Sequence, residues 1–301
     1  MRFRPGPRPR WQRCSVGGGR RAEEAGAVGA LFGLLTSLSI GTSDLFGRRV
    51  VTRCHVLSAM IVFQGAAALA ALAVLPFIPG SFAGDDFTRG LVSGFGLGAG
   101  LALYYTSLDR AGSAVAAPIV ATLSAVIPFA YTALRGHDPP LIGIIGAAVA
   151  FGGLGLVTAG GTRGKHVGAG TVWATLSGLG YGIGLSVLVD LSESSGAWPG
   201  FGQRLTSVGL MAAVVAARGL PALPPPDVLG FAFLTGVASA AATIFYIVGI
   251  WFDPPTTVVG ASMFPVMSVI VGRVAYQDYL NSRQSIGIVA AVAGVAAVVA
   301  A

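Results

Sequence analysis

Residues 141–159 read LIGIIGAAVAFGGLGLVTA, an apolar run that contains no charged residue. A helix that crosses the hydrocarbon core of a bilayer, about 30 Å thick, needs roughly 20 apolar residues. Runs of similar length recur along the chain, separated by short connectors rich in Gly, Pro and charge. The predicted membrane-spanning helices, about ten in number, cover residues 26–46, 55–78, 90–108, 113–134, 141–159, 168–189, 198–217, 228–250, 256–275 and 284–301.

The composition excludes most other classes of protein. Charged residues make up 10% of the 301 residues and the mean hydropathy is +0.77, whereas soluble domains carry about 25% charged residues. The chain has too few charges for a water-facing surface or for a disordered protein. Its continuous apolar runs also differ from the short alternating strands of a transmembrane β-barrel. The sequence therefore predicts an all-α membrane protein.

Residues 1–24 form a separate segment in which arginines greatly outnumber acids. We predict a disordered, Arg-rich tail here. Most of the net charge of +7 lies in this tail, so the charge gives no support for nucleic acid as a partner. Cys14 and Cys54 form no C-x-x-C motif, and neither a disulfide framework nor a cysteine metal site is expected. We predict no metal and no cofactor.

A shift of 141 positions aligns the two halves of the chain without a gap. It places Gly29 on Gly170, Tyr105 on Tyr246, Ile145 on Ile286, Gly146 on Gly287 and Gly153 on Gly294. Each half holds about five spans, an odd number, so the second half enters the membrane from the opposite side. We predict two inverted five-helix repeats, residues 25–160 and 167–301. Many secondary transporters have this architecture, with the substrate site between the repeats near the midplane.

Two of the predicted helices carry stripes of glycine. They are Gly94, Gly96, Gly98 and Gly100 on residues 90–108, and Gly178, Gly180, Gly182 and Gly184 on residues 168–189. In lipid, small residues let helix backbones approach closely, so we expect these stripes to be packing contacts. The alternative is that such thin faces leave room for a cavity or let helices slide.

The last helix pair of each half resembles the EamA type of the drug/metabolite transporter superfamily, and the resemblance covers about residues 25–301. The family pattern is a mid-helix Pro, then Gly-Glu, a Gly nine positions after the Glu and another Gly seven later. The second half supplies Pro265, Asp278, Gly287 and Gly294, and the first supplies His137, Gly146 and Gly153. Gly41-Thr42-Ser43-Asp44 also resembles a subgroup of bacterial EamA-like proteins. The family Glu is absent from both halves. The resemblance implies export or uptake of small metabolites or drugs.

Polar residues inside predicted spans are the first candidates for a substrate site, because charge in hydrocarbon is costly. Arg204 lies about seven residues into its helix, beside Gln203, and the repeat places Gln64 opposite Leu205. We predict that Gln64, Gln203 and Arg204 face a central cavity and bind a polar or anionic part of the substrate. The alternative is that Arg204 extends its side chain to the membrane surface.

Asp44 is the only acid within the first predicted span. A carboxylate in a partly dehydrated site can take up a proton, so we assign Asp44 a role in proton coupling. The alternative is an acid at the water interface that pairs with Arg48 or Arg49.

Aromatic and proline residues complete the set of candidates. An aromatic pocket for a flat or cationic solute could form from Tyr104, Trp173 and Tyr181. The same set includes Tyr105 and Tyr246, which lie late in their predicted helices. The alternative is anchoring at the membrane interface and core packing. Pro118, Pro128 and Pro265 interrupt helices, where they free carbonyls and supply hinges, or are tolerated as simple kinks.

The sequence thus predicts a secondary transporter that works by alternating access, with proton coupling as one option. Enzyme motifs such as H-E-x-x-H, a Walker loop and G-x-S-x-G are missing, so an enzyme is not expected. The competing hypothesis is a non-transporting membrane scaffold or sensor with a degenerate transporter fold. The partners expected for the protein are a small-molecule substrate and the lipid bilayer, and a homodimer is a possible assembly. Nucleic acid is not expected as a partner.

The orientation in the membrane is harder to predict from charge. Lys and Arg favour the cytoplasmic side, but the odd-numbered connectors and the Arg-rich tail, which lie on opposite sides, are both basic. We expect a multi-pass protein of the plasma membrane with both termini in the cytoplasm, because the resemblance implies it.

Overall fold

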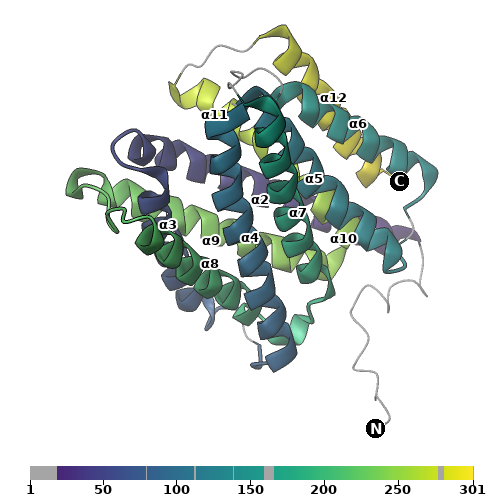
Figure 1. Cartoon of the computed structure of the whole chain (residues 1–301). Helices are drawn as coiled ribbons and strands as arrows, with labels where there is room; N and C mark the ends of the chain where they lie inside the picture. The colour runs from purple at the N-terminus through teal and green to yellow at the C-terminus, as the bar shows by residue number, and fades with distance from the viewer. Residues whose placement is uncertain are drawn as a thin grey trace.

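The computed structural model describes residues 19–78, 80–111, 113–137, 139–158, 166–276 and 281–300, and these form helices, turns and connectors only. Asp278 and residues 1–18 of the predicted tail lie outside the described residues. The helices are α2 (Gly19–Val51), α3 (Val56–Val74), α4 (Gly84–Ala111), α5 (Ser113–Leu134), α6 (Leu141–Thr158), α7 (Val167–Val187), η1 (Leu188–Asp190), η2 (Glu193–Ser195), α8 (Trp198–Ala217), η3 (Pro226–Val228), α9 (Leu229–Phe252), α10 (Pro254–Ala261), α11 (Phe264–Tyr276) and α12 (Ser282–Val299). Figure 1 shows them as one bundle.

Helix α2 begins earlier than the sequence suggested. It starts at Gly19, so residues 19–24, which we expected in the disordered tail, are helical. Arg and Glu at positions 20–24 have good helix propensity, which lets the helix extend beyond its apolar part.

Seven helical segments of the described chain are long and apolar enough to cross a membrane: Glu23–Val51, Val56–Val74, Val115–Leu134, Val167–Asp190, Pro226–Phe252, Pro254–Ala275 and Ser282–Val299. Leu141–Val157 is apolar but shorter. Helices α4 and α8 are not among the seven; charged or amide side chains such as Asp86, Arg89, Gln203 and Arg204 make them more polar. The chain is thus a multi-pass membrane protein, and the number ten stays a prediction.

The predicted span 256–275 lies within one apolar segment, Pro254–Ala275, that is long enough to cross a membrane, but the structure divides this segment into α10 and α11. Pro265 has no backbone N–H, so the carbonyl of Ala261 loses its usual helical donor. The hydroxyl of Ser37 on α2 donates to that carbonyl at 2.9 Å and to the Gly260 carbonyl at 2.7 Å. A neighbouring helix therefore supplies the hydrogen-bond donor that the carbonyls at the break lack.

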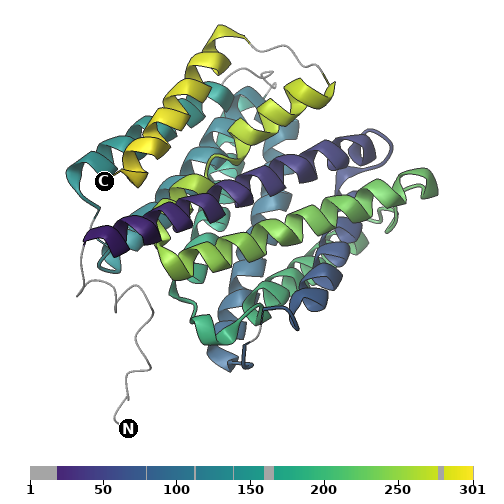
Figure 2. The same ribbon diagram turned by 180° about the vertical axis from the view of Figure 1, so that it is seen from behind.

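The two halves of the chain interleave. Helix α4 packs against α7 and α8, and α9 packs against α2 and α3. Helices α3 and α8 contact each other, while α5 covers α7 and the pair α10–α11 covers α2. Helices α6 and α12 lie side by side at one edge of the bundle in both views (Figures 1 and 2).

Glycines hold the closest of these contacts. A Cβ on Gly96 of α4 would lie 2.7 Å from the carbonyl oxygen of Gly180 on α7, and one on Gly94 would lie 2.1 Å from that of Gln203 on α8. Gly178 and Gly182 face side chains of α5. The two glycine stripes are therefore packing contacts, as the sequence predicted, and leave no space between these helices.

Helices α6 and α12 meet through a reciprocal set of glycines. A Cβ on Gly146 would lie 2.8 Å from the carbonyl oxygen of Gly294, and one on Gly153 would lie 2.6 Å from that of Gly287. Each contact is therefore paired with another in which the partners' roles are exchanged.

Because short connectors join successive helices, neighbours in sequence run in opposite directions. Helix α4 thus begins where α5 and α7 end, and Asp190 lies at this end of the bundle. We call it the Asp190 end. The other, where α2 ends and α3 begins, is the Cys54 end.

Candidate functional site

Arg204 lies on α8 in the interior of the bundle, where its side chain is 5% exposed. Its Nη1 donates to Oε1 of Gln64 on α3 at 2.9 Å. Its Nη2 donates to the carbonyl oxygen of Ser239 on α9 at 2.6 Å and to the hydroxyl of Thr243. The guanidinium thus ties together three helices, and the alternative in which Arg204 reaches the membrane surface is wrong.

Gln203 extends these contacts to a fourth helix. Its Oε1 accepts a hydrogen bond from Thr243 at 2.9 Å, and its Nε2 donates to the hydroxyl of Ser93 on α4 at 2.9 Å. We call Gln64, Ser93, Gln203, Arg204 and Thr243 the polar network. It brings together all three polar residues that the sequence singled out, and links α3 and α4 to α8 and α9.

One donor of the polar network has no partner. Nε of Arg204 is buried without a hydrogen-bond acceptor in the described structure. A buried donor without an acceptor costs free energy, so such a donor commonly has a functional or conformational reason. Here it leaves one N–H available to a group that enters the interior.

Asp44 lies in the C-terminal part of α2 and is exposed, although it belongs to a membrane-spanning helix. Its carboxylate accepts a hydrogen bond from the hydroxyl of Ser268 on α11. It also interacts electrostatically with Tyr104, Tyr105 and Tyr181, which come from α4 and α7. Three tyrosines thus lie within electrostatic range of this carboxylate.

Tyr181 lies within electrostatic range of both Asp44 and the polar network. The rings of Tyr104 and Tyr105 have centroids 5.7 Å apart, and Tyr181 interacts electrostatically with both and with Arg204. Tyr246 points elsewhere, because its hydroxyl donates to the carbonyl of Leu185 at 3.4 Å.

Trp173 is not part of this group. The guanidinium of Arg110, at the end of α4, lies 5.5 Å from the centroid of its ring. Trp173 is eight residues from Tyr181 on α7, a rise of about 12 Å along the helix. This position agrees with the anchoring alternative rather than with an aromatic pocket.

The three prolines occupy different positions. Pro118 and Pro128 lie inside α5, which continues through both, and Pro265 is in the first turn of α11. Of the three, only Pro265 therefore stands at a described break between helices.

A cluster of charged residues at the Asp190 end was missed by the sequence analysis. The carboxylate of Asp190 accepts hydrogen bonds from the hydroxyl of Tyr131, at 2.6 Å, and from the guanidinium of Arg135. Nη1 of Arg89 lies 3.5 Å from the same carboxylate. The hydrogen bond to Asp190 raises the pKa of Arg135 above its ordinary value. We call Arg89, Tyr131, Arg135 and Asp190 the Asp190 cluster.

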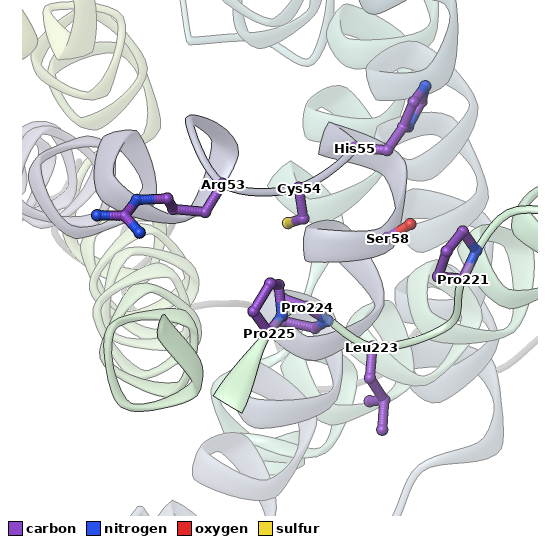
Figure 3. Close-up of a pocket in the computed structure, with 8 residues that line it drawn as sticks. All are labelled: Arg53, Cys54, His55, Ser58, Pro221, Leu223, Pro224 and Pro225. Atoms are coloured by element: carbon purple, nitrogen blue, oxygen red, sulfur yellow. The ribbon is translucent and has the colours of Figure 1, made fainter. Parts of the chain in front are cut away.

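A surface pocket of about 390 Å³ lies at the Cys54 end, away from the polar network. Its walls are Arg53, Cys54, His55, Ser58, Pro221, Leu223, Pro224 and Pro225. Figure 3 shows the side chains of Arg53 and His55 pointing away from each other, with Cys54 and Ser58 between them. Such an arrangement does not converge on one ligand group, and the described residues contain no cluster of three or more potential metal ligands.

Comparison with known proteins shows a likeness to one family over the first half of the chain. Residues 27–159 match the model of the EamA-like transporter family. The match covers less than half of the chain, and over these residues the sequence is similar to that family. A separate search of curated proteins found no match.

A likeness in fold to solved structures also extends beyond the matched residues. Among 28 matching chains of solved structures, one described only as a crystal structure of a protein has a TM-score of 0.72. It is 18% identical in sequence, and the match covers 90% of this chain and 96% of that chain. At this identity the likeness concerns the fold alone. The match extends the likeness in fold to most of the second half of the chain.

Proposed function

We propose that this chain is a gradient-driven secondary transporter that moves a small metabolite or drug-like solute by alternating access. The observation that carries the proposal is the polar network. It places a buried arginine and two amides between α3 and α4 of one half and α8 and α9 of the other. Polar side chains at such depth in a membrane protein commonly mark a solute path.

The helix contacts support two inverted halves. Helix α4 packs on α7 and α8, and α9, which follows α4 by the repeat offset, packs on α2 and α3. The glycine contacts between α6 and α12 are likewise exchanged by a shift of 141 positions. Reciprocal contacts of this kind are expected beside a twofold axis. Rocking one half against the other would open the path to each side in turn.

We assign roles to the candidate residues within this path. Gln64, Gln203 and Arg204 bind a polar or anionic part of the solute, and Tyr104 and Tyr181 flank it. Asp44, which is exposed among the tyrosines, takes up and releases a proton. The proposal places the bundle in the plasma membrane with both termini in the cytoplasm.

Pro118, Pro128 and Pro265 are the proposed hinges. Pro265 has the strongest support of the three, because it adjoins the break between α10 and α11. The position of Trp173 beside Arg110 gives it the weakest support among the substrate-binding residues.

Purified protein in liposomes tests the proposal directly. A panel of solutes selected by thermal-shift binding should include one that the protein transports, and Arg204→Ala should reduce that transport at least about tenfold, as expected for losing hydrogen bonds to a charged group. Arg218→Ala is the matched control, since Arg218 is an exposed arginine at the end of the same helix. Transport by Arg204→Ala at the parent rate would remove the polar network from the path. If no solute moves, the scaffold or sensor hypothesis takes its place.

A further inference from the structure

Asp190 joins the two halves of the chain at one end of the bundle. It belongs to η1, directly after α7, and its side chain is 20% exposed. Tyr131 and Arg135 reach it from α5, and Arg89 reaches it from α4. Arg89 also donates to the backbone carbonyl of Asp190 at 2.8 Å. One carboxylate of the second half is thus held by three side chains of the first half.

Further contacts fix the segment that follows Asp190. The backbone N–H of Ser192 donates to the carboxylate of Asp86 at 3.0 Å, and the backbone N–H of Ser81 donates to the carbonyl of Ser194 at 2.8 Å. An apolar cluster lies against the same segment and contains Leu188, Val189, Leu191, Tyr246, Ile247, Ile250, Val258 and Ala261. Charged and apolar contacts together close this end of the bundle.

The residues of the Asp190 cluster have no matching residues in the other half of the sequence. A shift of 141 positions replaces Asp190 by Arg49, Arg135 by Tyr276 and Arg89 by Gly230. Among these contacts, Asp86 alone has an acidic counterpart, which is Asp227.

That counterpart makes a weaker contact. Asp227 pairs with Arg53 at 3.6 Å, and the two side chains are 59% and 65% exposed. An exposed ion pair of this kind contributes little to stability. The pair of Asp227 and Arg53 is therefore a weaker contact than those of the Asp190 cluster.

We propose that the Asp190 cluster holds the solute path closed at the Asp190 end and so biases the transporter toward the state that is open at the Cys54 end. The inference rests on the proposed alternating access. For the path to open at the Asp190 end, Asp190 must leave Arg135 and Tyr131, and the apolar cluster must separate. A variant that lacks the carboxylate should therefore populate that state more often.

A cysteine reporter beneath the cluster measures this opening. Val258 is 1% exposed, packs in the apolar cluster and is close to cysteine in size. Val258→Cys in a background of Cys14→Ser and Cys54→Ser gives one reactive thiol. A membrane-impermeant maleimide is applied to sealed vesicles from each side, and a C-terminal tag, which follows α12 at the Asp190 end, reports the orientation of the vesicles.

Asp190→Asn should raise the labelling rate from the Asp190 end about tenfold, the size expected from losing a hydrogen bond to a charged group. Labelling from the Cys54 end should not rise. Asp190→Glu keeps the carboxylate and should label more slowly than Asp190→Asn. Asp85→Asn is the matched control, because it removes one exposed acid at the same end, from the first turn of α4, and should label as the parent does.

Two results would overturn the proposal. One is an unchanged labelling rate in Asp190→Asn, and the other is an equal rise from both ends, which would indicate general loosening of the bundle. The readout needs no solute. It therefore tests the closing role of Asp190 even if the transport assay fails, and a failed transport assay leaves the labelling result interpretable.

Discussion

Arg204 and Gln64 form a hydrogen bond of 2.9 Å although they lie 140 positions apart in the sequence. That separation differs by one from the repeat offset of 141, so the two residues occupy nearly equivalent positions in the two halves. Equivalent positions touch only near the axis that relates two halves. In the proposed arrangement of two inverted halves, the bond between α8 and α3 would therefore lie close to their axis.

A double-mutant cycle should detect this bond. Arg204→Ala leaves Gln64 and Thr243 without a donor, and we expect it to destabilise the protein by about 2–3 kcal/mol. Gln64→Ala and the double variant complete the cycle, and their effects should be non-additive by at least about 0.5 kcal/mol. Unfolding in detergent micelles provides the free energies. Effects that simply add would mean that the bond contributes nothing.

The membrane-spanning character of the chain could be predicted from the sequence because it depends on local composition. Apolar runs such as residues 141–159 mark spans whatever surrounds them. Pro265 was identified in the sequence as an interruption of the predicted helix 256–275, but a hinge and a simple kink were equally compatible with it. The missing element was the hydroxyl of Ser37, which comes from α2 and satisfies the carbonyl that Pro265 leaves free.

The candidate site also has features that local sequence predicts and features that depend on packing. The depth of Arg204 along its helix could be predicted from the sequence. The direction of its side chain could not, because it depends on acceptors from α3 and α9 that only the packed bundle supplies. Asp190 was overlooked because its partners, Arg89 and Arg135, lie in other connectors, far away in sequence. Three charges at the ends of predicted spans were the only available signal.

Two adjacent glycines of α6 should respond oppositely to alanine. In Gly153→Ala the new Cβ would lie 2.6 Å from the carbonyl oxygen of Gly287, so α12 must move, and we expect a loss of about 1–3 kcal/mol. Gly152 has open space at this position, so Gly152→Ala should stabilise the helix by about 0.5–1 kcal/mol. Thermal unfolding should show a lower transition temperature than the parent for Gly153→Ala and a higher one for Gly152→Ala. Equal effects would contradict the described contact of α6 and α12.

Removal of the Ser37 hydroxyl should destabilise the break between α10 and α11. Ser37→Ala leaves the Ala261 carbonyl without a donor in the interior, at a cost of about 1–3 kcal/mol. Thr42→Ala is the control, since the hydroxyl of Thr42 bonds only the Leu38 carbonyl of its own helix among the described contacts. Thermal unfolding measures the transition temperature of each variant. If Ser37→Ala lowers it no more than Thr42→Ala does, the break needs no hydrogen bond from Ser37.

Asp44→Asn should uncouple transport from the proton gradient. The substitution keeps an acceptor for Ser268 but removes the group that can carry a proton. With one proton per solute, a gradient of about 1 pH unit sustains up to about tenfold accumulation, since one unit corresponds to about 1.4 kcal/mol. We expect proteoliposomes of the parent to approach this ratio and those of Asp44→Asn to stop at equal concentrations, while exchange of solute down its own gradient continues. Asp227→Asn, which changes an exposed acid at the Cys54 end, should accumulate solute as the parent does. Accumulation by Asp44→Asn at the parent ratio would assign proton coupling to another residue.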